Sequence, residues 1–515
     1  MDSKETVNES HIMDSKETVN ESHTMDSKET VNESRLESAS PPPEKLTPEG
    51  EEQLLLRWSA EEQARIIRKV DLRLIPVCGL LYCASLLDRT NLANAAIAGM
   101  NLELNIRNVN GVDRYSLITL MFFITYTIFQ PPGGILTRKF GPRLFLSALC
   151  FLWGIVVIGF GFAEHWSHLV GMRAVLGLLE AGFFPGVVYL MSTWYKRYEM
   201  GKRYACFYLI GAGASAFGGI LAYGLMQMDG VAGYRGWRWI FIIEGIMTCC
   251  VALVGARFLL SFPDSSNSRS LRFLTADEQQ CILERVNVDR GDADVAKFNF
   301  RQWLAGGKDW KIWAYALIFG CITTVSYALA YFLPIILNSD LGFSIGLSQC
   351  LVAPPYVFSA FIMILTGWWG DKYQMRGPPL VFNAILAIVG LSILGFHDTP
   401  GIRYFGVFLA AAGANANIPV CMSYQANNIR GQWKRAFCSA TLVGFGSLGG
   451  IVGSTVFRAQ DRPGYRPGIV TTIASQGVII LLVAILSIDI RRQNGKADRG
   501  EKVLEEGDAS FRYTF

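Results

Sequence analysis

Charged side chains are scarce in this chain. Asp, Glu, Lys and Arg together make up 17% of its 515 residues, whereas a soluble globular protein averages about 25%. This share is too small to cover the surface of a soluble protein of this size, and 51% of the residues are hydrophobic. The shortage excludes an ordinary soluble domain and favours an integral membrane protein.

Patterns for metal binding, disulfides and catalysis are also missing. The chain has 11 cysteines, but no two share a C-x-x-C spacing, and no extracellular type of disulfide framework is apparent. No nucleophile–base set stands out in the loops. We therefore expect no metal, no cofactor, no nucleic-acid partner and no enzymatic activity. We also expect no cleavable signal peptide, because the first apolar run begins about seventy residues into the chain.

Apolar windows, by contrast, recur along most of the chain. A bilayer-spanning helix needs about 20 apolar residues. Twelve such windows can be counted, near residues 72–98, 117–136, 144–162, 169–191, 207–226, 237–260, 312–337, 347–369, 380–396, 404–424, 437–457 and 469–488. The longest internal loop separates the sixth from the seventh, and six plus six is the arrangement of a duplicated transporter. The pattern predicts an all-α integral membrane protein of twelve transmembrane helices in two six-helix halves.

The windows also predict how the chain is divided. Residues 1–50 repeat "MDSKETVNES" three times and form a polar, disordered tail. A charged, amphipathic helix at residues 51–70 leads into the first bundle, 71–260. The second bundle spans residues 311–490, and a further tail spans residues 491–515. The loop between the bundles, 261–310, contains a short helix, because Thr275 and Glu278 form a capping-box pattern.

Basic residues set the expected orientation. Lys and Arg concentrate in the loops that follow the even-numbered spans, and short loops rich in these residues are usually cytosolic. We therefore expect both termini in the cytosol. The protein is expected to be a monomeric, multi-pass protein of the plasma membrane.

Two related loops follow spans 2 and 8. They read "GILTRKFGPR" (134–143) and "GWWGDKYQMR" (367–376), and they resemble the signature G-x-L-a-D-r-x-G-r-[RK] of the major facilitator superfamily. The first copy has Arg138 where the signature has an acid, whereas the second keeps the acid. The residues that match the signature are expected to gate the transporter: Gly134, Gly141, Arg143, Gly367, Asp371 and Arg376.

Longer strings resemble the fungal anion:cation symporter family, which includes permeases of allantoate, nicotinate, pantothenate and biotin. They include "LDRTNLANAAIAGM" (87–100), "RAVLGLLEAGFFPGVVYLMSTWY" (173–195) and "GWRWIFIIEG" (236–245). The resemblance implies the major facilitator fold and proton-coupled symport of a small organic anion by alternating access. The proton gradient would be the energy source. One departure is "PPG" after Gln130, where the family commonly has P-S-N on a cavity-lining helix.

Asp88 and Arg89 interrupt an apolar span. A charged side chain there costs at least about 2.5 kcal/mol, so it normally has a partner and faces a polar cavity. Successive residues point about 100° apart on a helix, so these two side chains pair poorly with each other. We expect Asp88 and Asn91 to line a central cavity and Arg89 to turn toward a neighbouring acid. The alternative is a topological anchor at the inner end of the span.

Span 4 offers such an acid. Arg173, Gly177 and Glu180 lie at i, i+4 and i+7 on one helix face. Arg173 and Gly177 match the superfamily pattern R-x-x-x-G, which implies an arginine tied to proton coupling or substrate charge. Glu180 lies in an apolar stretch, where a carboxyl group is suited to loading and releasing a proton. A static hydrogen bond between helices is the alternative role for Glu180.

The second half has no comparable acid or base in mid-span. It offers neutral polar groups instead, at Tyr327, Asn415, Asn417 and Gln425. Charge from the first half and hydrogen bonds from the second suit a small vitamin-, ureide- or carboxylate-like anion.

Two other functions stay open. One is a proton-antiport exporter of a hydrophobic metabolite, although no proline occurs between Gly201 and Gly236, where the usual antiporter pattern has one. The other is a non-transporting nutrient sensor, which would keep an intact site and carry long cytosolic tails.

Overall fold

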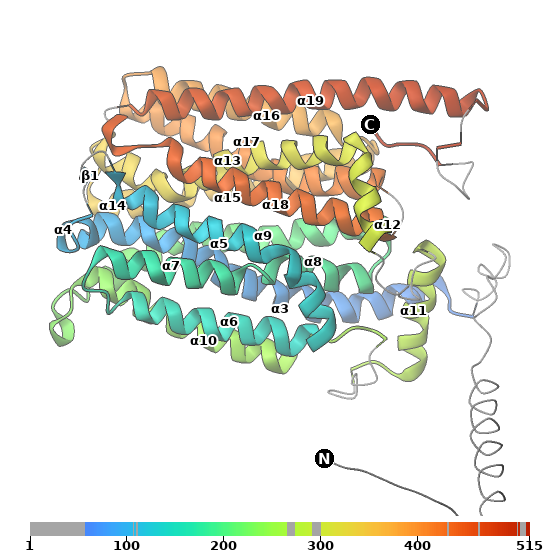
Figure 1. Ribbon diagram of the computed structural model, residues 1–515, viewed down its shortest axis with the longest axis horizontal. Coiled ribbons are helices and arrows are strands. Elements are labelled where there is room, and N and C mark those ends of the chain that lie inside the picture. The colour runs from blue at the N-terminus through green and yellow to red at the C-terminus, as the bar shows by residue number, and fades with distance from the viewer. Residues whose placement is uncertain are drawn as a thin grey trace, which may run out of the picture. The chain divides into compact units, whose positions relative to one another are not determined.

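The computed structural model describes residues 57–106, 108–109, 112–264, 273–290, 300–429, 432–461, 464–501, 503–504 and 511–515 (Figure 1). The tail expected at residues 1–50 lies outside this part of the chain. The described elements are mostly α-helices: α3 (Ala60–Ala95), α4 (Asn101–Glu103), α5 (Arg114–Phe140), α6 (Pro142–Phe160), α7 (Trp166–Glu180), α8 (Phe183–Trp194), α9 (Arg197–Met226), α10 (Gly236–Phe258), α11 (Ala276–Arg290), α12 (Phe300–Ala305), α13 (Trp310–Ser339), α14 (Ile345–Cys350), α15 (Ala353–Lys372), α16 (Gly377–Phe396), α17 (Pro400–Asn428), α18 (Gln432–Val456) and α19 (Arg466–Asp498). Short β1 (Asn108–Val109) and β2 (Val112–Asp113) pair antiparallel.

The first transmembrane helix and the charged segment before it form one continuous helix, α3. It begins after Ser59, whose Oγ accepts a hydrogen bond from the Glu62 backbone N–H (3.2 Å), while Glu62 accepts one from the Ser59 N–H (2.9 Å). This capping box satisfies N–H groups that a helix start leaves without partners. The lead-in helix expected at residues 51–70 is therefore not a separate element within the described residues.

The fourth span is one helical segment, Trp166–Trp194, with a short break at Ala181 and Gly182, although both residues keep right-handed helical backbone angles. α7 ends at Glu180 and α8 begins at Phe183, with Ala181 and Gly182 between them. The break lies against α5, because a Cβ added at Gly133 would overlap the backbone of Gly182. Glycine at position 133 permits this close backbone approach. The break places Glu180 at the end of a helix, beside a tight contact with α5.

The helices pair in the same way in both halves. In the first half α3 packs on α9, α5 on α7, and α6 on α10. The corresponding second-half pairs are α13 with α18, α15 with α17, and α16 with α19. Between the halves, α9 packs on α15 and α5 on α18. This repeated pairing is the tertiary counterpart of the two related loops in the sequence.

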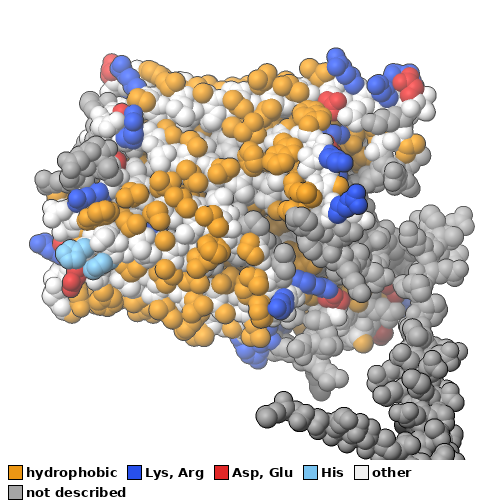
Figure 2. All heavy atoms as spheres, viewed as in Figure 1, with side chains coloured by type: hydrophobic (Ala, Val, Ile, Leu, Met, Phe, Trp, Pro, Cys, Tyr) orange, Lys and Arg blue, Asp and Glu red, His pale blue; other side chains and the backbone are white. Residues whose placement is uncertain are grey.

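Twelve transmembrane helices account for the apolar windows. Among the described residues, 11 helical segments are long and apolar enough to cross a membrane. α5, 27 residues long, packs among them and completes the twelve. Figure 2 shows hydrophobic side chains over the middle of the face that is in view, with most Lys, Arg, Asp and Glu toward its two ends. Lipid requires this distribution of side chains.

Helical structure also occurs outside the expected apolar windows. α11 is the short helix expected in the central loop, and its capping box is present: Glu278 N–H donates to Thr275 Oγ1 (3.2 Å) and Thr275 N–H to Glu278 (3.0 Å). α19 continues to Asp498, so part of the tail expected at 491–515 is helical. We call the end of the bundle with α11 and α12 the α11 end, and the opposite end the β1 end (Figure 1).

Candidate functional site

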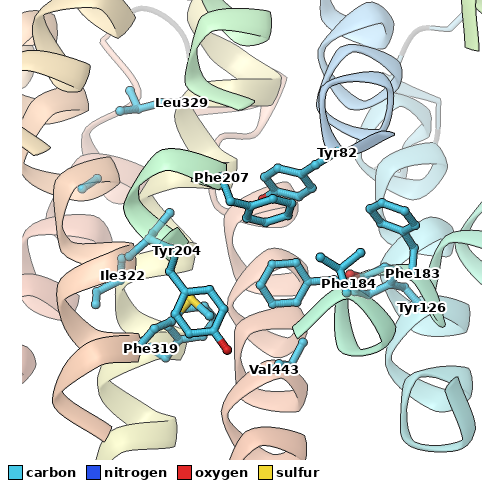
Figure 3. Close-up of a cluster of buried hydrophobic side chains, with 14 of the residues drawn as sticks. Tyr82, Tyr126, Phe183, Phe184, Tyr204, Phe207, Phe319, Ile322, Leu329 and Val443 are labelled. Atoms are coloured by element: carbon cyan, nitrogen blue, oxygen red, sulfur yellow. The ribbon is translucent and has the colours of Figure 1, made fainter. Parts of the chain in front are cut away.

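A cavity lies between the two halves. It is partly open to solvent, and residues of both halves line it. Its aromatic lining consists of Tyr82, Tyr126, Phe184, Tyr208, Phe319, Tyr327 and Tyr356. Its polar lining consists of Arg89, Thr90, Thr323, Ser326, Asn415 and Ser447. Figure 3 shows Tyr82, Tyr126 and Phe184 of the first half together with Phe319 and Val443 of the second.

Arg89 forms a buried ion pair with Glu180. The Arg89 Nη2 and Nε atoms donate to Glu180 Oε2 at 2.9 and 3.2 Å. The two side chains are 4% and 0% exposed, and Ser85 Oγ donates to the same carboxylate oxygen (2.9 Å). Arginine stays protonated in proteins, so this carboxylate supplies the charge that compensates the buried cation. α3 and α7 are thereby joined at the cavity wall.

Arg89 also reaches the second half. Its Nη1 atom donates to the hydroxyl oxygen of Tyr327 on α13 (2.7 Å). The guanidinium lies 5.2 Å from the ring centre of Tyr126 and 5.6 Å from that of Tyr327, within the range of cation–π attraction. Among the residues that line the cavity, Arg89 is the only one with a charged side chain. A single cation, surrounded by rings, therefore contacts both halves.

Asp88 and Asn91 lie elsewhere. Asp88 is 2% exposed and accepts a hydrogen bond from Thr248 of α10 (3.5 Å), and Asn91 lies beside Glu244 of the same helix. Neither residue is part of the cavity lining. This corrects the expected assignment of faces. Because adjacent residues diverge by about 100°, turning Arg89 to the cavity turns Asp88 into the interior of the first half.

Arg173 is buried behind the cavity. It is 1% exposed, and its guanidinium lies 5.4 Å from the ring centre of Phe160 and 6.0 Å from that of Phe122. Its Nε and Nη1 atoms have no hydrogen-bond partner among the described residues. Gly177, one turn further along α7, packs so closely on α5 that an added Cβ would overlap Phe122 O. Arg173 and Glu180 thus share a helix face, but only Glu180 contacts a residue that lines the cavity.

The expected amide residues divide between cavity and scaffold. Asn415 lines the cavity. Gln130 is 3% exposed and accepts from Ser447 Oγ (3.1 Å), which links α5 to α18 between the halves. Asn417 instead donates to Leu380 O in α16 (3.2 Å), and Gln425 lies near the end of α17, beside Cys438. Asn417 and Gln425 are not among the residues that line the cavity.

The two signature loops carry different ion pairs. In the second loop Arg376 pairs with Asp371 (2.5 Å). In the first, Arg138 pairs with Asp264, which follows α10 (2.7 Å). Arg138, which stands at the position of the signature's acid, is thus paired with an acid from another segment.

The other signature residues lie in or beside the same helices. Gly134 belongs to α5 and Gly367 to α15. Gly141 joins α5 to α6 with φ 81°, a backbone conformation that favours glycine. Arg143 donates to Ala256 O of α10 (2.6 Å).

The aromatic lining is the part that sequence reasoning missed. Apart from Tyr327, none of these rings was among the expected site residues. A signal was available on α3, because Tyr82, Leu86 and Arg89 follow the i, i+4, i+7 spacing of one helix face. Elsewhere, aromatic residues in apolar spans are too common for their spacing to distinguish a cavity wall from lipid contact.

Contacts between the halves lie beyond the cavity, toward the β1 end. Gln349 Nε2 donates to Asn94 O (3.3 Å), and Tyr115 Oη donates to Tyr331 O (3.1 Å). The backbone of Gly219 on α9 lies against Gln349 O. Each of these residues on α3, α9 and α13 follows the cavity residues of its helix in the direction of the β1 end. These contacts separate the cavity from that end of the bundle.

Comparison with known proteins agrees with this architecture. A sequence profile of the Major Facilitator Superfamily matches residues 78–454. The chain is 31% identical over 456 residues to the MFS-type transporter cnsO of Penicillium expansum (87% of each chain). It is 29% identical over 434 residues to the high-affinity nicotinic acid transporter of Saccharomyces cerevisiae (84% of this chain, 79% of that one). Among solved structures, the proton:xylose symporter XylE matches with a TM-score of 0.62 and 16% identity, covering 80% of this chain and 94% of that chain.

Proposed function

Because this chain belongs to the major facilitator superfamily, and its relatives are named as transporters rather than enzymes, we propose that it is a proton-coupled symporter of a small organic anion. The protein is an integral, multi-pass membrane transporter of a small molecule. We propose three further properties: the coupling to protons, the negative charge of the substrate and the direction of transport. The observation that carries it is the buried Arg89–Glu180 pair at the wall of a cavity shared by both halves.

The coupling follows from charge balance at Arg89. While Glu180 is ionised, it compensates the buried guanidinium. Once Glu180 takes up a proton, Arg89 is an uncompensated buried cation, a situation that costs about 3–5 kcal/mol when one partner of a buried pair is removed. A substrate carboxylate in the cavity restores the balance. Proton and anion therefore load together, and an empty site returns with Glu180 ionised.

The second half gives this loading a mechanical consequence. Tyr327 on α13 accepts a hydrogen bond from the same guanidinium. A movement of Arg89 therefore changes contacts in both halves. Alternating access then consists of rocking the two bundles around this shared site. We place the α11 end in the cytosol, because the basic loops after the even-numbered spans lie there, and the protein in the plasma membrane as a monomer.

Proton-antiport export of a hydrophobic metabolite is the weaker candidate. It fits the aromatic lining, but it leaves Arg89 without a role in binding. A cavity built only for apolar molecules has no need of a charge that costs at least about 2.5 kcal/mol to insert.

The test first identifies a substrate and then examines whether Glu180 carries the coupling proton. A permease-deficient yeast that expresses the chain is offered labelled nicotinate, pantothenate, biotin, allantoate and sugar acids. The anion taken up is then followed with the purified protein in proteoliposomes. In Glu180→Gln, which mimics the protonated acid, we expect uptake driven by a pH gradient to be lost. Exchange of substrate without a gradient should continue, because exchange releases no net proton.

A matched control is available at the β1 end. Glu103 also pairs with an arginine, Arg238 (2.8 Å), and accepts from Trp237 Nε1 (2.6 Å), but it lies outside the cavity lining. Glu103→Gln should keep both uptake and exchange. Equal loss of both activities in Glu180→Gln would show that the carboxyl group is structural or binds substrate, and would contradict its role in coupling.

A further inference from the structure

Residues 511–515 fold back onto the second half at its α11 end. Figure 1 marks the C-terminus beside α19, and the segment contacts α13, α17, α19 and the start of α16. The last residues of a chain are usually poorly ordered unless contacts tie them down. We propose that residues 511–515 are a clamp, a docked peptide segment that holds this end of the second half in one conformation and thereby slows the transport cycle.

Two asparagine side chains bind the backbone of the clamp. Asn494 on α19 accepts a hydrogen bond from the Tyr513 N–H (3.0 Å) and donates one to Tyr513 O (2.9 Å). Asn428, the last residue of α17, does the same with Thr514, at 2.7 and 3.0 Å. A carboxamide that pairs with both backbone groups of one residue imitates the edge of a β-strand, which is how many proteins bind extended peptides. The two pairs together form a docking site for an extended segment.

The side chains of the clamp add contacts with the bundle. The ammonium of Lys311, a 4% exposed residue of α13, lies 3.8 Å from the ring centre of Tyr513, within the range of cation–π attraction. Phe511 is buried and packs edge-on against the same ring, with centres 5.1 Å apart. The guanidinium of Arg491 on α19 lies 6.0 Å from the ring centre of Phe515. Docking thus covers a buried cation as well as binding the backbone.

The clamp also reaches the signature loop that follows α15. The carbonyl oxygen of Phe515 accepts a hydrogen bond from the backbone N–H of Arg376. This N–H lies at the start of α16, where a helix leaves its first N–H groups without internal partners. The Arg376 side chain pairs with Asp371 (2.5 Å), and its Nη2 atom lies 3.7 Å from where a Cβ would stand on Gly201 of α9. Arg376 therefore connects the clamp to a contact between the two halves.

This arrangement gives docking a consequence for transport. While all of its contacts persist, the clamp holds the ends of three helices and the signature loop in fixed relative positions. A change of conformation at the α11 end requires Arg376 to leave Gly201 and these ends to shift. A segment that binds one conformation better than the others increases the population of that conformation. Release of the clamp should therefore speed the cycle.

Two variants release the clamp in different ways. Asn494→Leu removes a side chain whose hydrogen bonds, among the described residues, go only to Tyr513. Thr514→Pro removes the N–H that Asn428 accepts and changes no helix, so it cannot disturb the bundle itself. The matched control is Gln493→Leu, which removes the neighbouring carboxamide of α19, one that donates within the helix.

Docking is measured by hydrogen exchange on the purified full-length chain in lipid nanodiscs, which requires no substrate. The fragment that covers residues 511–515 should exchange about tenfold more slowly than a free peptide of the same sequence, because its amides are hydrogen-bonded. Asn494→Leu and Thr514→Pro should each lose most of this protection, and Gln493→Leu should keep it. An unprotected fragment in the unchanged chain would overturn the docking.

The effect on the cycle is measured as exchange of the anion identified in yeast, in proteoliposomes and per reconstituted molecule. Both release variants should exchange about threefold faster, since each loses hydrogen bonds that favour one conformation. Gln493→Leu should exchange at the normal rate. An unchanged or lower rate in Thr514→Pro, with protection lost, would show that the segment does not restrain the cycle and would overturn the clamp. Anion symport itself would stand.

Discussion

The two halves share one pattern of helix pairing but differ in the chemistry they bury. In the first half, α3, α7 and α10 bury Asp88, Arg89, Arg173, Glu180 and Glu244. The second half lines the cavity with hydroxyls, an amide and rings, and none of its lining residues is an acid or a base. The same arrangement of helices thus holds charged side chains in the first half and supplies neutral cavity-lining residues in the second.

This difference indicates how work is divided in a duplicated transporter. Charges inside a membrane must be compensated by partners at short range, so they are best kept within one bundle that moves as a unit. Arg89 and Glu180 meet that condition, because both belong to the first half. The neutral contact from Tyr327 can break and re-form as the second half moves, because no charge is left unpaired when it opens.

The largest effect is expected from the charged side of the comparison. Arg89→Lys should weaken substrate binding and exchange by about 100-fold, because lysine lacks the planar fork and loses hydrogen bonds to charged groups, which are worth about 1.5–3 kcal/mol each. Tyr327→Phe, which removes only a hydroxyl from the neutral side, should weaken binding about tenfold or less. Both are measured by equilibrium binding and exchange in proteoliposomes. Similar losses in the two variants would remove the division between the halves.

The next largest effect is expected at a close contact between the two halves. A Cβ at Gly219 would overlap Gln349 O of the second half, whereas a Cβ at Gly213 of the same helix meets nothing within 4 Å. Gly219→Ala should slow exchange about tenfold, since relieving such an overlap costs about 1–3 kcal/mol. Gly213→Ala serves as the control and should exchange at the normal rate. Unchanged exchange in Gly219→Ala would mean that close approach toward the β1 end is not needed for transport.

The two signature loops offer a smaller contrast. Asp371, 33% exposed, pairs with Arg376, which is only 12% exposed, whereas both partners of the Arg138–Asp264 pair are exposed, by 33% and 39%. Exposed pairs are typically worth about 0–1 kcal/mol. Asp371→Asn should therefore slow countertransport several-fold, and Arg138→Ala less than about twofold. Equal effects in a countertransport assay would contradict the asymmetry between the loops.

The smallest effect is expected outside both halves. Residues 1–40 are polar and repetitive and contain nothing that could bury a core. Their deletion should leave the transport rate per surface molecule unchanged, measured as uptake normalised to surface-labelled protein. A lower rate per molecule would show that this segment acts on one of the bundles.

Much of the fold could be predicted from local sequence. The windows around residues 72–98 and 312–337 predict α3 and α13, because lipid imposes an apolar composition on each span separately. The helix α11 follows from the residues of its own first turn. The close approach of Gly182 to Gly133 of α5, beside the break after Glu180, could not be predicted in this way, because it depends on how two helices pack.

The candidate site was predictable as chemistry but not as geometry. The sequence indicates that Arg89 needs an acid and that Glu180 is available. It also indicates that Asp88 and Arg89 point in different directions. The sequence favours Asp88 as the residue that faces the cavity, whereas in the structure Arg89 does. A helix can be rotated about its axis without changing its composition, so the direction of each face is decided by the helices packed around it.

By itself, the sequence determined that this chain spans a membrane, that it is built from two related halves, and that charge is concentrated in the first. Composition, spacing and internal similarity express these properties locally, because each span must satisfy the bilayer by itself. Only the tertiary structure decided that Arg89 pairs with Glu180, 91 residues away, and that Tyr327 joins them from the other half. The same is true of the ring of aromatic residues around them. A hydrogen bond requires atoms within about 3 Å, and only the packing of twelve helices brings residues so distant in the chain to that separation.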